Sequence, residues 1–120
     1  MGDRITYQKL KKVTSDSYEL ARKYYGLLSV LNGLSLTERE LQLVSYASIK
    51  GNISLPENRQ EFCEKYGTSE ATINNMVSKL KKASIFIKAG GKVIVNPHIV
   101  PNFKGDLVLQ ITLRNGAEAR

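Results

Sequence analysis

The most constraining feature of the sequence is a pair of predicted helices that have almost no linker between them. Pro56 occupies a first-turn position, where its missing N–H costs nothing, and it begins a helix that Gly67 ends. Thr68 or Ser69 then caps a second helix, which runs to about Ala83. Two helices joined by so short a turn must cross at a steep angle.

Beyond the second of these helices, the spacing of apolar residues changes from that of a helix to that of a strand. The runs 85–87 and 93–95 consist of β-branched and aromatic residues and flank a Gly-Gly pair at 90–91. Such a pair favours the two-residue turn of a β-hairpin. An Asn-Pro pair at 96–97 ends the returning strand, because proline has no N–H to donate to a sheet.

Two further helices are predicted before this segment. One covers about Ser17 to Asn32. The second begins at Thr37 and runs to about Ile49. It starts with a capping box, in which the side chains of Thr37 and Glu40 each accept a hydrogen bond from the other residue's backbone N–H. The first helix has an apolar stripe made of Leu20, Ala21, Tyr24, Leu27, Leu28 and Leu31. Outside this stripe lie three more large residues, Tyr18, Tyr25 and Val30.

The two ends of the chain carry alternating patterns. The stretch 106–114 alternates apolar and polar residues and predicts a half-buried strand, and a shorter alternation within 4–13 predicts a strand or arm. A loose tail follows at 115–120. The segment 53–55 is too short to be more than a connecting strand.

The positive charge of the chain is concentrated in one region. The chain has 18 Lys and Arg residues against 11 Asp and Glu, a net charge of +7. Between Ala71 and Lys104 there are six lysines and not one acid, whereas the stretch from Thr37 to Glu70 carries six acids. The sequence therefore predicts a basic side, which favours a polyanionic partner.

The order helix, short strand, helix, tight turn, helix and hairpin is the layout of a winged helix-turn-helix domain. The stretch 58–99 resembles plasmid replication initiators of the RepL type, in the residues NRQEFCEKYGTSEATINNMVSKLKKASIFIKAGGKVIVNPHI. The pair LTERELQLV and GTSEATINNMVSKL is also similar to LuxR-type regulators, which do not continue into a wing. We therefore expect an α+β fold, a winged helix-turn-helix with an extra N-terminal helix and a C-terminal β-strand. Its expected divisions are 1–35 (arm and helix), 36–100 (winged helix) and 101–120 (strand and tail).

The resemblance implies that the helix beginning at Pro56 positions the next one, which enters the major groove of DNA. If Ile73, Val77 and Leu80 point inward, the other side of that helix faces out. The side chains expected to read bases are Thr72, Asn74, Asn75 and Ser78, since amides and hydroxyls can bond to base edges. Those expected to bind phosphates are Lys79, Lys81, Lys82, Lys88 and Lys92.

Other kinds of chemistry find little support in the sequence. The single cysteine, Cys63, has no partner for a disulfide or metal cluster, and the only histidine, His98, has no nearby Cys, Asp or Glu to complete a metal site. No phosphate loop, nucleophile elbow or paired carboxylates can be found. We expect no enzymatic activity, cofactor or metal. No apolar run approaches a membrane span, so we expect an intracellular protein without a membrane partner.

The sequence thus predicts a non-enzymatic double-stranded DNA-binding protein, a transcription regulator or replication initiator of a plasmid or phage, acting in a bacterial cytoplasm. We expect it to form a homo-oligomer through the helix 17–32 or the strand 106–114. The alternative is a structural or adaptor component of a larger assembly such as a phage virion, in which the winged helix packs against neighbouring structural proteins. The absence of Arg from the helix 69–83, and Glu70 at its start, favour this alternative.

Overall fold

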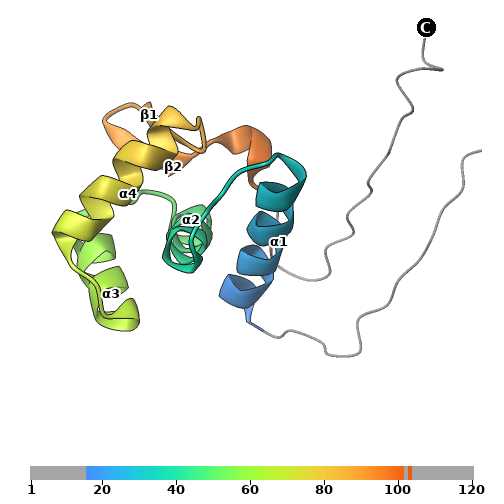
Figure 1. Ribbon diagram of the computed structural model, residues 1–120. Helices are drawn as coiled ribbons and strands as arrows, with labels where there is room; N and C mark the ends of the chain where they lie inside the picture. Colours follow the sequence, from blue (N-terminus) through green and yellow to red (C-terminus); the bar gives the residue numbers. More distant parts are fainter. Residues whose placement is uncertain (1–15, 102, 104–120) are drawn as a thin grey trace, which may run out of the picture.

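The computed structural model describes residues 16–101 and 103, and within them the fold is α+β (Figure 1). Four helices precede a two-stranded antiparallel sheet and a short 3₁₀ helix. The elements are α1 (Ser17–Leu31), α2 (Glu38–Lys50), α3 (Pro56–Tyr66), α4 (Glu70–Lys82), β1 (Phe86–Ala89), β2 (Lys92–Val95) and η1 (Pro97–Ile99). The arm predicted within 4–13, the strand predicted at 106–114 and the tail at 115–120 lie outside the described residues.

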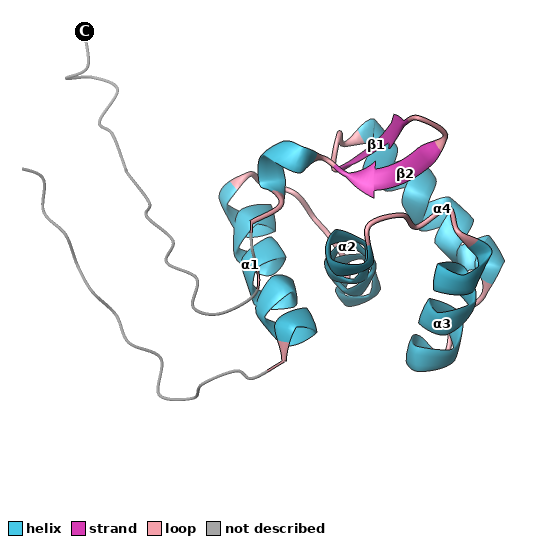
Figure 2. Ribbon diagram, turned by 180° about the vertical axis from the view of Figure 1, so that it is seen from behind, coloured by secondary structure: helices cyan, strands magenta, loops and turns pink. Residues whose placement is uncertain are grey.

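Helix α2 is the centre of the molecule. In both views it lies between α1 on one side and the pair α3 and α4 on the other, with the β1–β2 hairpin nearby (Figures 1 and 2). Because it is covered from several directions, α2 buries more than one face: Leu41, Leu43, Val44, Tyr46 and Ala47 all belong to the core. The capping box predicted for this helix is confirmed, and Thr37 is its N-cap.

The buried face of helix α1 only partly matches the stripe that its sequence predicts: Leu20, Ala21, Tyr24 and Leu28 belong to the core or pack against it. The residues it buries are Ala21, Tyr25 and Ser29, whereas Leu27 and Leu31 are 39% and 50% exposed. The prediction that Tyr25 lies outside the buried stripe is therefore wrong. Apolar residues cover so much of this helix that periodicity alone does not select a face, and contact with α2 decides it.

The junction between α3 and α4 follows from local chemistry, as predicted. Gly67 adopts the left-handed conformation, with φ of +63°, and its N–H and that of Thr68 both bond to the carbonyl of Cys63. Ser69 is the N-cap of α4 and accepts a hydrogen bond from the N–H of Thr72. The turn thereby closes one helix and opens the next within three residues.

The predicted hairpin is confirmed, with Phe86 paired with Val95 and Ala89 with Lys92 across the turn. Both turn glycines have positive φ, as a two-residue turn of this kind requires. Asn96 fixes the hairpin to the end of α4, because its Nδ2 donates to the carbonyl of Ser84 at 3.1 Å. The connecting strand predicted at 53–55 is not formed, and only the N–H of Ile53 bonds to the hairpin, at the carbonyl of Val93.

Candidate nucleic-acid interface

The outer face of α4 carries the predicted contact residues of that helix. Ile73, Met76, Val77 and Leu80 are buried, so Met76 adds to the three inward residues that the sequence predicts. The exposed residues include Thr72, Asn74, Asn75, Ser78, Lys79, Lys81 and Lys82. Exposure places all seven where a ligand could reach them, but their side chains are not equally free.

Lys79 is held by a buried carboxylate. Its Nζ lies 3.0 Å from Glu40 Oε1 and 3.3 Å from the carbonyl of Ser35, and Glu40 is only 4% exposed. Burial opposes ionisation of Glu40, but hydrogen bonds from Thr37 and Lys79 outweigh this effect and hold the pKa of the Glu40 carboxyl below its ordinary value. The ion pair joins α4 to α2, so Lys79 fixes the position of α4.

Thr72 belongs to the first turn of α4 and takes part in its cap. Its hydroxyl lies 3.0 Å from Ser69 Oγ, and its N–H donates to the same oxygen at 3.2 Å. A hydroxyl can donate one hydrogen bond and accept others, so Thr72 keeps some capacity for a further partner. Asn75 and Ser78 are exposed, and within the described part of the chain their side chains form no hydrogen bond.

Arg59 on α3 is a residue of this surface that the sequence reasoning missed. Its Nη1 donates to the side-chain oxygen of Asn74, and its Nε donates to the carbonyl of Ile53 at 3.0 Å. The lysines expected to bind phosphates all lie on α4 and the hairpin, and Arg59 belongs to neither element. Residues 59 and 74 belong to different helices, so periodicity within one element could not have paired them.

The side chains of the two hairpin lysines, Lys88 and Lys92, lie on opposite faces of the hairpin. Lys88 is paired with Val93 and Lys92 with Ala89, and facing residues of an antiparallel pair point to the same side. Lys88 therefore shares the face of the buried Val93, while Lys92 points the other way. Four exposed lysines of α4 and the hairpin form no ion pair with the described residues: Lys81, Lys82, Lys88 and Lys92.

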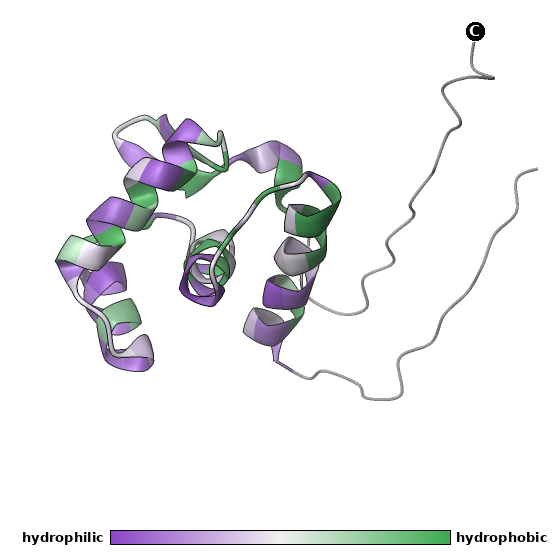
Figure 3. Ribbon diagram, viewed as in Figure 1, coloured by the Kyte–Doolittle hydropathy of each residue, from purple (hydrophilic) through white to green (hydrophobic). Residues whose placement is uncertain are grey.

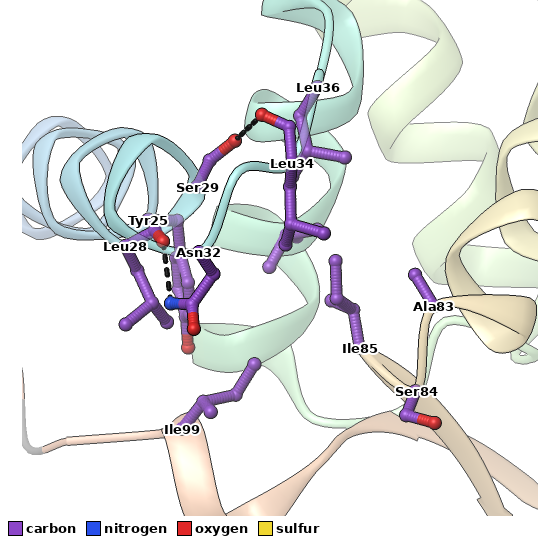
Figure 4. A pocket seen from close by; sticks show the side chains of 11 residues that line it. Tyr25, Leu28, Ser29, Asn32, Leu34, Leu36, Ala83, Ser84, Ile85 and Ile99 are labelled. Atoms are coloured by element: carbon purple, nitrogen blue, oxygen red, sulfur yellow. Dashed lines mark hydrogen bonds between the residues drawn. The ribbon is translucent and has the colours of Figure 1, made fainter.

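A cavity of about 440 Å³ lies between α1 and the ends of α4 and η1 (Figure 4). Most of its lining is apolar. The polar side chains of Ser29 and Asn32 bond to carbonyls of the chain itself, Leu34 and Leu28, each at 2.8 Å. Among the described residues that line it, the one titratable side chain is that of Tyr25.

The chain matches no family model, no curated protein and no solved structure. The resemblance to RepL-type initiators thus stays a prediction. Within residues 16–101 and 103, no helix is long and apolar enough to cross a bilayer. The same residues hold no group of three His, Cys, Asp or Glu side chains that could bind a metal ion.

Proposed function

We propose that the chain is a winged helix-turn-helix protein that binds double-stranded DNA without catalysis, as a regulator or replication initiator of a plasmid or phage in a bacterial host. In this proposal α3 and α4 form the helix-turn-helix, α4 enters the major groove, and the hairpin is the wing. One observation carries the proposal: apart from Lys79, which pairs with Glu40, the exposed lysines of α4 and the hairpin have no carboxylate partner among the described residues. Such lysines are suited to bind phosphates.

The proposed roles follow the contacts of each side chain. Asn75 and Ser78 are exposed on α4 and are assigned to base edges. Phosphate contact is assigned to Lys81, Lys82, Lys88 and Lys92. Thr72 is assigned to the groove edge near the start of α4, and Lys79 is assigned to holding α4 on α2 through Glu40.

Salt dependence of duplex binding tests the electrostatic part of the proposal. Binding to a labelled duplex, measured by fluorescence anisotropy over a range of salt concentrations, should weaken steeply as salt rises. Lys81→Ala should reduce the slope of log affinity against log salt by about one unit. Lys23→Ala is the matched control, because it removes one lysine from α1, across the molecule from α4 (Figure 1). Binding that ignores salt, or equal slopes in both variants, would contradict the proposal.

Sequence readout is tested by selecting bound sequences from random duplex DNA. Asn75→Ala should relax discrimination at one base pair and leave the remaining positions of the enriched motif unchanged. Absence of duplex binding would instead favour the structural or adaptor role, in which the face of α4 contacts protein. That role requires Asn75 and Lys81 to be dispensable or to be covered by a partner chain.

A further inference from the structure

The guanidinium of Arg59 is fixed at two points. Its Nε donates to the carbonyl of Ile53 at 3.0 Å, and its Nη1 donates to Asn74 Oδ1. The N–H of Ile53 in turn donates to the carbonyl of Val93 on β2 at 2.9 Å. One chain of hydrogen bonds therefore joins the hairpin, α3 and α4, and it ends on an exposed amide of α4.

The contact with Arg59 also determines which way the Asn74 amide faces. Arginine has five N–H donors and no acceptor, so the group of Asn74 that meets it must be the oxygen. The NH₂ group occupies the other branch of the amide and remains available to donate to another partner. Of the five N–H groups of Arg59, three remain for other partners, because two are used by Ile53 and Asn74.

We propose that Arg59 and Asn74 together form a donor pair that reads guanine in the major groove. This inference depends on the proposed DNA-binding function. Guanine presents two acceptors, N7 and O6, to the major groove, which two adjacent donors match. Adenine presents the N7 acceptor beside the N6 donor, so the same pair would leave donor against donor.

This assignment differs from the reading expected for a free asparagine. The amide of a free asparagine binds adenine by offering its oxygen and its NH₂ together to one base edge. The oxygen of Asn74 is bonded to Arg59 on α3, whereas Asn75, the next residue, has no such partner among the described residues. The structure therefore supplies from α3 the arginine that α4 lacks, and it directs Asn74 toward guanine.

Selection from random duplex DNA with wild-type protein, Arg59→Lys and Asn74→Ala tests the inference. Arg59→Lys keeps the positive charge but cannot bond to Ile53 and Asn74 at once in the same fork geometry. We expect one guanine position of the wild-type motif to lose about 10-fold in preference over adenine in both variants, while the other positions persist. Lys65→Gln is the control, because it removes a charge from α3 without contacting Asn74 and should keep that guanine.

A readout on the free protein separates the positioning role from a general loss of structure. The side-chain amide of Asn74 in the ¹⁵N spectrum should shift in Arg59→Lys, while backbone resonances of the buried α2 residues stay in place. Backbone shifts throughout α2 would show that the variant misfolds and would overturn the positioning role of Arg59.

The outcomes also separate this inference from the proposed function. If wild-type protein binds duplex DNA but enriches no guanine, or if both variants keep the same guanine, the guanine reading is overturned and DNA binding stands. If wild-type protein binds no duplex at all, the proposed function and this inference fall together.

Discussion

Glu40 has two structural roles, in a capping box and in an ion pair, and only the first can be predicted from the sequence. Its role in the capping box is local, and the spacing from Thr37 to Glu40 predicts it. Its ion pair with Lys79 joins residues 39 positions apart, and no local pattern predicts such a pair. The sequence therefore suggested phosphate contact for a lysine that the fold holds on α2.

Substitution of Glu40 by glutamine should destabilise the protein by about 1–2 kcal/mol near neutral pH. Glutamine preserves the capping box but removes the charge that pairs with Lys79. The pKa of Glu40 is lower in the folded protein than in the unfolded chain, so the carboxylate stabilises the fold above its unfolded pKa of about 4.3. This stability is lost as the pH falls through the folded pKa.

Urea denaturation between pH 3 and 7, the range of carboxyl titration, measures the free energy of unfolding of both proteins. The difference between wild type and Glu40→Gln should be largest near pH 7. The two curves should converge at acid pH. Lys79→Met is the complementary variant, and combining it with Glu40→Gln should cost less than the sum of the two single changes. A difference between wild type and Glu40→Gln that is constant with pH would contradict this account.

At the scale of the elements, the sequence predicted the ends of helices and strands better than their buried faces. Pro56, Gly67 and the glycine pair at 90–91 act through backbone conformation, which depends on neighbouring residues alone. The buried face of α1 depends on what α2 presents to it, so Tyr25 was assigned to the wrong side. The weakly apolar run 53–55 likewise formed one hydrogen bond to the hairpin and no strand.

Ser84 stands at the end of α4 in a conformation that favours glycine, with φ of +60°. Its N–H bonds to the carbonyl of Lys81 at 3.0 Å, and its own carbonyl accepts from Asn96. Both contacts are made by backbone atoms of Ser84, so Ser84→Gly keeps them and removes the strain of a Cβ at positive φ. We expect a gain of about 0.5–1 kcal/mol in the free energy of unfolding.

Chemical denaturation of Ser84→Gly beside Ser84→Ala checks this expectation. Alanine retains a Cβ and should give no gain, whereas glycine should raise the denaturation midpoint with an unchanged slope. Equal midpoints for the glycine and alanine variants would mean that the hydroxyl, and not the backbone, determines stability here.

At the scale of the whole molecule, the described part of the chain has two different ends. The face of α4 and the hairpin carry exposed lysines, while α1 lies on the far side of α2 (Figures 1 and 2). The last turn of α1 is hydrophobic (Figure 3), and its residues Val30 and Leu31 are exposed. The charge pattern of the sequence predicted a basic side, but the exposed apolar residues of α1 could not be predicted, because they depend on which face of α1 packs against α2.

We predict that a second copy of the chain covers the exposed side of α1. Three of the four exposed large apolar residues in the described structure lie within one turn of this helix: Leu27, Val30 and Leu31, at 39%, 75% and 50% exposure. Pairing two copies there would bury these side chains and leave α4 of each copy accessible, because α1 and α4 flank α2 from opposite sides (Figure 1). The fourth such residue, Leu55, precedes α3 and offers a matched control.

Sedimentation equilibrium over a range of protein concentrations should accordingly show a dimer for the wild type and a monomer for the double variant Leu27→Ser, Leu31→Ser. Leu55→Ser should remain dimeric, since it removes an exposed leucine from a site outside α1. Leu27 and Leu31 are 39% and 50% exposed in the single chain, so their loss should destabilise the monomer by less than the loss of two core leucines, and the double variant should stay folded. A wild type that stays monomeric at the highest concentration reached, or a double variant that still dimerises, would mean that α1 is not the interface between copies.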